Sequence, residues 1–122
     1  MNIARRWPTP GAQFTIGSSV NAAMLSFTKA MADVGVGDRV QVNAINPGAV
    51  RTARLVARLR TLSKERGISE AEAEALMVAD AGITRIGEPD DVANLVAFVV
   101  SPQNRYLHGA LIDLDGGTTK TM

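Results

Sequence analysis

The sequence predicts an α/β fold in which three parallel strands are covered by helices. Short runs rich in β-branched and apolar residues alternate along the chain with longer segments whose apolar residues recur at helical spacing. Helices separate the strand runs, and strands joined through a helix lie parallel to each other with right-handed crossovers. The predicted order is strand, helix, strand, a helical excursion, helix and strand.

The chain opens with a short predicted strand, "MNI", and a long predicted helix. The spacing predicts this helix over 18–34, capped by Ser18 or Ser19 and ended by Gly35 and Gly37. We expect one apolar stripe of the helix to cover the sheet and to meet a partner helix. This stripe consists of Val20, Met24, Phe27, Met31 and Val34.

A strand and two helices are predicted next. Residues 39–45, "RVQVNAI", have the pattern of a strand that "NPG" ends, because Pro47 has no N–H to donate to a ladder. Apolar spacing predicts a basic helix over 53–66. The sequence "SEAE" at 69–72 is a capping box that opens another helix, through about Ala79.

The last helix and strand have the clearest patterns. "GEPDDVANLVAFVVS" places Pro89 in the first helical turn, and Asp90 and Asp91 at the positive end of the helix dipole. Residues 110–117, "ALIDLDGG", predict a short strand closed by paired glycines. The buried stripe of the helix is expected to comprise Val92, Leu95, Val96 and Val99.

Composition and charge exclude several classes of protein. The 122 residues are 46% hydrophobic, which predicts one globular domain. The 13 basic and 12 acidic residues give a net charge of +1, so nothing draws the chain to nucleic acid or to an anionic membrane. Without cysteine there is no disulfide, no Cys-ligated zinc and no thiol nucleophile. The longest apolar runs are too short to span a membrane, and the first residues lack the apolar segment of a secretory signal. We expect a cytoplasmic protein with no metal, nucleic-acid or membrane partner.

Four segments, taken in order, resemble the C-terminal half of short-chain dehydrogenases/reductases: "NAAMLSFTKAMA", "VQVNAINPGAVRT", "RIGEPDDVANLVAFVVS" and "YLHGALIDLDGG". The resemblance implies a partial Rossmann fold that holds the fifth, sixth and seventh strands of the family, as a single partial domain over 1–122. It also implies that the helical excursion at about 53–82 corresponds to the lid that the family places over its substrate.

The resemblance further implies NAD or NADP as the cofactor. In the family, a glycine-rich turn among the first four strands holds the pyrophosphate at a helix N-terminus. No G-x-G-x-x-G occurs in this sequence, so we expect the chain alone not to hold the dinucleotide. The loop after the sixth family strand would wrap the nicotinamide, although "NPG" has the alternative interpretation of a simple strand-ending turn. The residues assigned to cofactor binding are Asn21, Pro47, Gly48, Ala49, Val50 and Thr52.

The catalytic positions that the family uses are substituted in this chain. Family members reduce a carbonyl with a Tyr that gives a proton, a Lys that lowers the pKa of the Tyr, and a Ser that orients the substrate. Alignment on "AA" and "TK" puts Gly17 at the Tyr position, Asn21 at the Lys position and Ala4 at the Ser position. None of the three carries an acidic proton or a positive charge. The sequence therefore predicts a divergent branch, Gly-x-x-x-Asn, with no intact proton relay.

Several other polar residues have both a structural and a functional interpretation. His108, the only histidine, is expected to be a packed or surface residue and not a general base. Asp113 and Asp115 are expected to be structural and not paired catalytic carboxylates. Ser18 or Ser19 could donate to a substrate carbonyl instead of capping the helix. A basic run is interpreted as a solvated helix face balanced by nearby glutamates, with a phosphate site as the alternative: Arg51, Arg54, Arg58, Arg60, Lys64 and Arg66.

Two functions of different classes follow from these patterns. The first is the C-terminal portion of an NAD(P)-dependent oxidoreductase that is not catalytically competent as this chain alone. The second is a non-catalytic half-Rossmann module that acts by association. For either function the resemblance implies a homo-oligomer, because the family forms its subunit contacts through the 18–34 helix and the C-terminal strand. A small open parallel sheet also leaves an unpaired edge, so we expect the chain to be oligomeric, completed by another chain, or marginally stable.

Overall fold

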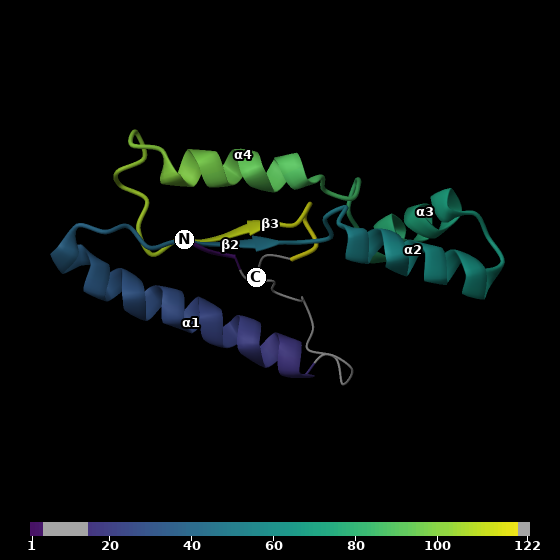
Figure 1. Ribbon diagram of the computed structural model, residues 1–122, viewed down its shortest axis with the longest axis horizontal. Helices are drawn as coiled ribbons and strands as arrows, with labels where there is room; N and C mark the ends of the chain where they lie inside the picture. The colour runs from purple at the N-terminus through teal and green to yellow at the C-terminus, as the bar shows by residue number, and fades with distance from the viewer. Residues whose placement is uncertain (4–14, 120–122) are drawn as a thin grey trace.

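The computed structural model describes residues 1–3 and 15–119 of the chain, in three layers (Figure 1). A parallel sheet lies in the middle, α1 covers one face, α4 covers the other, and α2 and α3 project beyond the end of β2 (Figure 1). The elements are β1 (Asn2–Ile3), α1 (Thr15–Asp38), β2 (Ala44–Pro47), α2 (Ala53–Arg66), α3 (Glu70–Ala81), α4 (Pro89–Val100) and β3 (Leu111–Leu114).

The sheet has the order β1-β2-β3, with both pairs parallel. Asn2 is in register with Ala44, and Ala44 is in register with Leu111. The predicted α/β fold with three parallel strands and covering helices is therefore confirmed. In the part of the chain that the structure describes, β1 and β3 form the two edges of this sheet.

Small side chains form the contact between α1 and the sheet. Ala32 and Thr28 of α1 are buried, as are Ala44 and Ile45 of the central strand. The buried Thr28 hydroxyl is satisfied, because it donates to the Met24 carbonyl at 2.8 Å and accepts from Asn2 Nδ2 at 2.9 Å. Buried hydroxyls cost free energy unless they are paired, so these two bonds make the polar residue tolerable in the interface.

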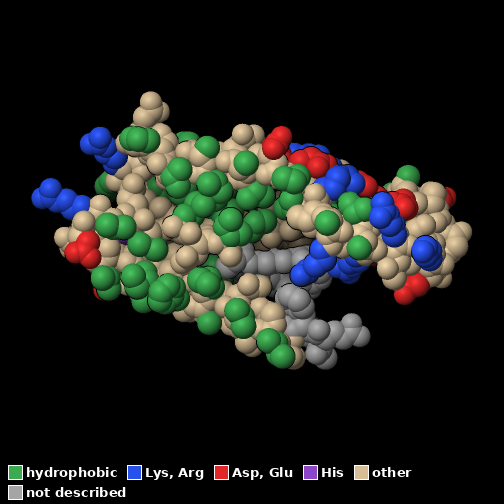
Figure 2. All heavy atoms as spheres, in the orientation of Figure 1, with side chains coloured by type: hydrophobic (Ala, Val, Ile, Leu, Met, Phe, Trp, Pro, Cys, Tyr) green, Lys and Arg blue, Asp and Glu red, His purple; other side chains and the backbone are tan. Residues whose placement is uncertain are grey.

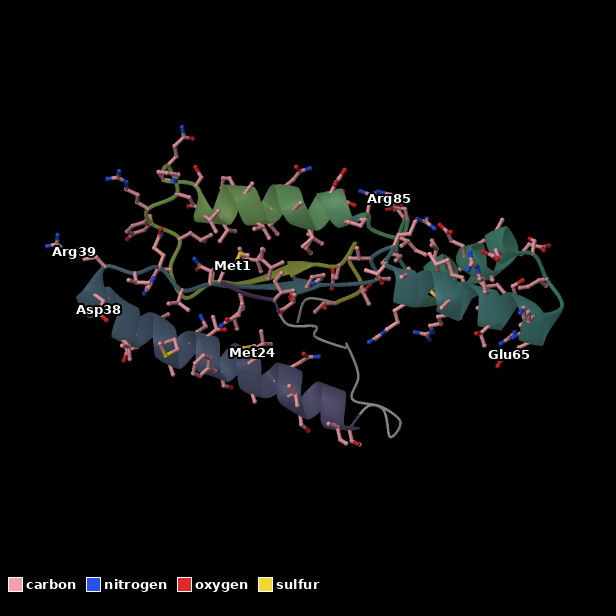
Figure 3. All side chains as sticks on the ribbon, viewed as in Figure 1. Met1, Met24, Asp38, Arg39, Glu65 and Arg85 are labelled. Atoms are coloured by element: carbon pink, nitrogen blue, oxygen red, sulfur yellow. The ribbon has the colours of Figure 1, made fainter. Side chains whose placement is uncertain are left out.

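Helix α1 extends beyond the predicted range 18–34 at both ends, and the predicted glycine stops are wrong. The helix continues through Gly35 and Gly37 and ends where Arg39 adopts a left-handed conformation with φ of 58°. The Val40 N–H then donates to the Gly35 carbonyl at 2.9 Å, which closes the helix end in the manner of a Schellman motif. Figure 3 marks Arg39 at this end.

The predicted apolar stripe of α1 does not face the sheet, which corrects the expectation that it would cover it. The face that is buried carries Thr28, Ala32 and Gly35, at spacings of four and three residues. The apolar residues lie on the other side, where Figure 2 shows hydrophobic side chains along α1. Three members of the stripe are more than half exposed: Val20 (59%), Phe27 (54%) and Val34 (59%).

The two longer strands are shorter than predicted, and one of them is shifted. The run 39–45 was expected to form a strand ending before Pro47, yet β2 begins at Ala44 and includes that proline. Pro47 occupies the last position, and the next residue supplies the ladder bond, since Gly48 N–H donates to the Leu114 carbonyl at 3.0 Å. Strand β3 likewise ends at Leu114, before the paired glycines.

The predicted stripe of α4 does face the molecule. Val99 is buried and the other three members are half-buried. Pro89 stands at the start of the helix, as the sequence predicts. Asp91 accepts from the Glu88 N–H at 2.7 Å, and this satisfies one of the free N–H groups at the helix end.

Helices α2 and α3 enclose a small apolar cluster of their own. The predicted capping box opens α3, with the Ser69 N–H donating to Glu72 Oε2 at 2.8 Å and the Glu72 N–H donating to Ser69 Oγ at 3.2 Å. Gly67 and Gly82 end the two helices in left-handed conformations, each with φ of 64°. The buried members of the cluster are Leu55, Leu59, Ala73 and Ile86.

Candidate functional site

The segment that follows β2 forms the base of the candidate site. It pairs with the segment before α4: the Gly87 N–H donates to the Ala49 carbonyl at 2.9 Å, and the Arg51 N–H donates to the Gly87 carbonyl at 2.8 Å. Gly48 has no room for a side chain, because a Cβ there would lie 2.7 Å from the Asp115 Cα. The chain therefore needs glycine at this position to pack the loop against the end of β3.

A cleft of about 520 Å³ opens above this loop, at the carboxyl ends of the strands. Open α/β sheets bind ligands at this end, and the volume is within the range of small-molecule sites. Backbone and small side chains form the floor, and α2 and the first turn of α4 form the walls. The lining residues are Pro47, Gly48, Ala49, Val50, Thr52, Arg54, Leu55, Arg58, Pro89 and Val92.

Five of the six residues assigned to the cofactor line this cleft; Asn21 does not. Gly17 and Asn21 are partly buried in the first turns of α1. Because α1 runs antiparallel to the strands, they lie toward the same end of the sheet as the cleft (Figure 1). Ala4 lies outside the described residues.

Thr52 connects the loop to α2. It is the N-cap residue, and its hydroxyl oxygen accepts from the Leu55 N–H at 3.4 Å. The Thr52 N–H itself donates to the Val50 carbonyl at 2.8 Å, which bends the chain tightly before the helix. Since the hydroxyl acts as an acceptor in the cap, its proton can still be donated toward the cleft.

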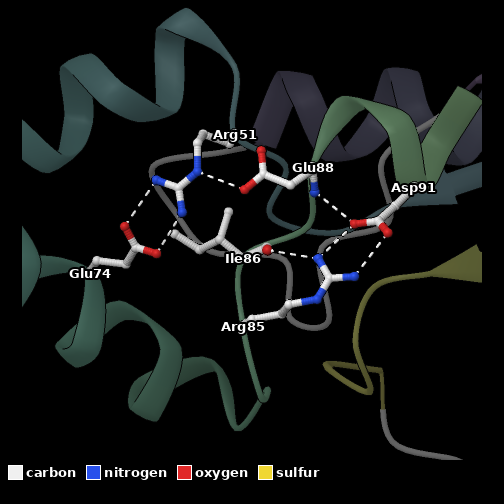
Figure 4. A network of polar contacts seen from close by, with 6 residues as sticks. All are labelled: Arg51, Glu74, Arg85, Ile86, Glu88 and Asp91. Carbon is white, nitrogen blue, oxygen red and sulfur yellow. Dashed lines mark hydrogen bonds and ion pairs between the residues drawn. The ribbon is translucent and has the colours of Figure 1, made fainter.

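Arg51 joins the loop to α3 and α4 (Figure 4). Its guanidinium donates to both carboxylate oxygens of Glu74, at 2.7 and 3.0 Å, and to Glu88 Oε1 at 2.8 Å. A second bidentate pair lies beside it, with Arg85 donating to the two oxygens of Asp91 at 2.6 and 2.9 Å. These pairs connect α3, the segment before α4 and the start of α4 into one network.

The network shifts the pKa values of Arg51, Glu74 and Asp91. The hydrogen bonds to Glu74 and then to Glu88 raise the pKa of Arg51 above its ordinary value. The hydrogen bond from Arg51 lowers the pKa of Glu74, and burial opposes this with a smaller effect. The hydrogen bond from Arg85, together with the Glu88 N–H, lowers the pKa of Asp91 to about 2. Arg51, Glu74 and Asp91 are thus charged at neutral pH.

The basic run divides into members with and without acidic partners. Arg51 is paired as described, and Arg60 lies 3.4 Å from Glu70. For these two the interpretation of charges balanced by nearby glutamates is confirmed. Arg54 and Arg58 instead line the cleft, where the preferred interpretation of a solvated helix face does not describe them. Their spacing of four residues places them on one side of α2, and this was the available signal.

His108 has a structural position at the opposite end of the strands. Its Nε2 lies 2.6 Å from the Ala32 carbonyl, and its Nδ1 accepts from the Val42 N–H at 3.3 Å. Both ring nitrogens therefore link α1 to the segment before β2, and the prediction of a packed residue is confirmed. Tyr106, the only tyrosine, precedes β3 at this same end and is fully exposed, so it lies away from the cleft.

The two aspartates of the last strand are in polar contacts of different kinds. Asp113 Oδ1 accepts from Asn46 Nδ2 at 2.9 Å. Asp115 turns the chain after β3, accepting from the Gly117 N–H at 2.9 Å and the Thr119 N–H at 2.8 Å. Burial raises the pKa of Asp115, but these hydrogen bonds outweigh it and hold the pKa below its ordinary value. The contacts of Asp115 agree with the structural role predicted for it.

Two buried polar atoms, near the start of α1 and at the end of β2, have no hydrogen-bond partner among the described residues. They are Ser18 Oγ and Asn46 Oδ1. The prediction that Ser18 or Ser19 caps the helix is wrong, because α1 begins at Thr15 and the Ser19 hydroxyl donates to the Thr15 carbonyl within its first turn. Unpaired buried polar atoms are costly, which marks this region as one that a further group would complete.

Residues 1–3 and 15–119 contain no candidate metal site and no candidate membrane span. No group of three or more His, Asp or Glu side chains in these residues is placed to hold a metal ion. None of the helices found there combines the length and the apolar character that crossing a bilayer requires.

Comparison with known proteins identifies relatives of the chain. The family model described as enoyl-(acyl carrier protein) reductase matches residues 9–119. The NADPH-dependent reductase BacG of Bacillus subtilis is 29% identical over 120 residues, which are 98% of this chain and 46% of the relative.

Solved structures agree with this match. The NADPH-dependent reductase YwfH, involved in bacilysin biosynthesis, superposes with a TM-score of 0.85 at 29% identity, over 99% of this chain and 46% of that one. The L-sorbose reductase of Gluconobacter frateurii, in complex with NADPH and L-sorbose, gives a TM-score of 0.82 at 28% identity, over 88% of this chain and 41% of that one. The chain thus spans less than half the length of these relatives, and it belongs to the short-chain dehydrogenase/reductase family.

Proposed function

We propose that this chain forms the nicotinamide side of an NAD(P)-dependent oxidoreductase and does not complete a turnover by itself. The observation that carries the proposal is the cleft at the carboxyl end of β2, whose floor is the loop Pro47–Thr52. The family supports the cofactor class, because the reductases BacG and YwfH are described as NADPH-dependent.

The groups present in the cleft fit a nicotinamide. The carboxamide of that ring needs both donors and acceptors, and the Thr52 hydroxyl and the loop backbone supply them. Val50 and Val92 offer apolar surface for the flat ring. When bound, the reduced nicotinamide would supply a hydride. The residues of this chain would bind the ring, orient its face and exclude water from it.

At the positions where the family has its catalytic Tyr and Lys, this chain has no residue that can donate a proton to the substrate. Gly17 has no ionisable group, and the Asn21 amide is neutral at all ordinary pH values. Tyr106 lies at the far end of the strands. A turnover would therefore need a donor from a segment or chain beyond the residues described, and the buried Ser18 and Asn46 atoms lie at the end of the sheet where such a donor would act.

Titration of the 122-residue chain with two probes tests this proposal. NADPH reports on the whole dinucleotide site, and 1-methyl-1,4-dihydronicotinamide reports on the ring alone. We expect the small probe to shift the amide resonances of Ala49, Val50 and Thr52 at millimolar concentration, and Thr52→Val to weaken this effect. We expect NADPH to show no saturable micromolar binding.

The two probes test different parts of the proposal, so each has its own contradicting result. Tight NADPH binding by this chain would contradict the incomplete cofactor site. A small probe that leaves the loop amides unchanged would contradict the assignment of the nicotinamide to Pro47–Thr52. Thr118→Val, outside the cleft lining, is the matched control and should bind the small probe like the unsubstituted chain.

A second candidate function is association without catalysis, as a half-Rossmann module. The exposed apolar side chains of α1 favour it, because large contiguous apolar patches on a protein surface mark interaction sites. We propose a second copy of the chain as the partner, through α1 and the C-terminal strand. The absence of cysteine suits a reducing compartment such as the cytoplasm for either function.

A further inference from the structure

One wall of the cleft carries positive charge without acidic compensation. Arg54 and Arg58 of α2 are exposed and line the cleft, and its described lining contains no Asp or Glu. Leu55, between them in sequence, also lines it and is buried. The wall thus combines two guanidinium groups with an apolar surface.

The two arginines differ from the other cations nearby. Arg51 is held by Glu74 and Glu88, and Arg60 lies beside Glu70. Among the described residues, no acidic side chain pairs with Arg54 or Arg58. Figure 2 shows Lys and Arg side chains gathered over the α2 and α3 region. Two cations that keep their hydrogen-bond donors free, on one side of a helix and in a cleft, suit an anion.

The start of α2 adds to this potential. The helix begins at Ala53, beside the cleft, and its first turn contains no acidic residue. The positive end of its dipole is therefore uncompensated and lies on the same wall as the guanidinium groups. The opposite wall is neutral where it lines the cleft, with Pro89 and Val92.

We propose that Arg54 and Arg58 bind the phosphate or carboxylate group of an amphiphilic substrate whose apolar part lies against Leu55 and Pro89. The inference deepens the proposed function, on which it rests, since it names the substrate class for the same cleft. The two guanidinium groups hold the anionic end at the wall of α2. The apolar part then extends over the loop, toward the position assigned to the nicotinamide ring.

Three probes with one chain length and different end groups test the inference: hexyl phosphate, hexanoate and 1-hexanol. Dissociation constants are measured for the 122-residue chain by titration followed with amide resonances, at low salt. We expect the anionic probes to bind at least about tenfold more tightly than hexanol, since a charge-assisted contact is worth about one factor of ten. Whichever of hexyl phosphate and hexanoate has the lower dissociation constant identifies the end group of the substrate as a phosphate or a carboxylate.

Matched double substitutions locate the anion. R54Q/R58Q should weaken hexyl phosphate about tenfold or more and leave hexanol unchanged. K64Q/R66Q removes the same charge from the last turn of α2, outside the cleft lining, and should change neither probe. Equal binding of hexanol and hexyl phosphate, or full hexyl phosphate binding by R54Q/R58Q, would overturn the inference.

Failure here is separable from failure of the proposed function. The uncharged 1-methyl-1,4-dihydronicotinamide should bind R54Q/R58Q like the unsubstituted chain, because it has no anionic group for the arginines to bind. If the dihydronicotinamide probe binds neither the unsubstituted chain nor R54Q/R58Q, the nicotinamide assignment is wrong. Binding of hexyl phosphate that depends on the arginines would still support the substrate inference. If NADPH does bind this chain, and R54Q/R58Q weakens that binding but not the binding of hexyl phosphate, the arginines serve the cofactor; the incomplete cofactor site and the substrate inference are then both wrong.

Discussion

Glycines at close contacts determine how tightly α1 and the loop after β2 pack. A Cβ on Gly35 would lie 2.3 Å from the Val40 carbonyl oxygen, and one on Gly48 would lie 2.7 Å from the Asp115 Cα. Neither backbone can move without disturbing an adjacent hydrogen bond, because Gly35 accepts from Val40 and Gly48 donates to Leu114. Both positions therefore require glycine for space, although neither has a left-handed φ.

Alanine at Gly35 and at Gly37 should have opposite effects on stability. Gly35→Ala forces its Cβ against the Val40 carbonyl, so we expect a loss of about 1–3 kcal/mol, as for overpacking of a core. A Cβ on Gly37 meets nothing within 4 Å, so Gly37→Ala should gain about 0.5–1 kcal/mol from helix propensity. Urea unfolding followed by circular dichroism measures both. Equal effects of the two substitutions would contradict the close contact.

Sequence patterns alone could not assign these glycines. Both look like helix stops, because glycine commonly ends helices. What ends α1 is the left-handed conformation of Arg39, a residue with no such preference, and it follows from the path of the chain toward β2. Gly35 is explained only when His108 and Val40 are seen to lie against it, and these contacts depend on the tertiary fold.

At the scale of elements, α1 shows what hydrophobic periodicity can and cannot determine. The period identified the helix and its apolar stripe, but not what covers the stripe. The sheet is covered by the face that carries Ala32 and Thr28, where small residues let the helix approach. The larger residues of the stripe, such as Phe27, face outward. A close contact between a helix and a sheet requires small side chains. The small size of the side chains therefore determines which face of α1 contacts the sheet, and their hydrophobicity does not.

Helices α2 and α3 are tied to the rest of the fold through Arg51, so their local stability should depend on it. Arg51→Met removes the pairs with Glu74 and Glu88 while retaining an unbranched apolar side chain. We expect amide hydrogen exchange in α3 to become severalfold faster, because opening of the helix pair no longer breaks these bonds. Exchange in α1, on the other side of the sheet, should stay as it is.

Arg60→Met is the matched control for this element. Its contact with Glu70 is longer, at 3.4 Å, and both side chains are more than half exposed. Exposed pairs of this kind contribute little, so exchange in α3 should not change. Acceleration by both substitutions alike would mean that loss of positive charge, and not the link through Arg51, loosens the helices.

For the whole molecule, the sequence predicted the layers and the position of the cleft better than its walls. Alternation of strands and helices was enough to predict a parallel sheet, whereas the loop after the central strand was assigned to the cofactor from the resemblance to the family. Five of the six residues assigned to the cofactor line the cleft because they lie together in that loop. For Arg54 and Arg58 the sequence left two interpretations open, since a basic helix face has the same pattern whether it faces solvent or a cavity.

The outward face of α1 predicts that the chain self-associates, which is the last consequence at this scale. Ile16, Val20, Phe27 and Val34 expose apolar surface on one helix, and burying it between two copies would remove it from water. We expect dimers or larger species at micromolar concentration in sedimentation equilibrium, and a shift to monomer for F27S/V34S. Because both side chains are more than half exposed, the double variant should keep its helical circular dichroism and lose at most about 1 kcal/mol of stability.

L76S, which substitutes an exposed leucine of α3, should associate like the unsubstituted chain. A stable monomer before any substitution would show that these side chains serve no contact between copies.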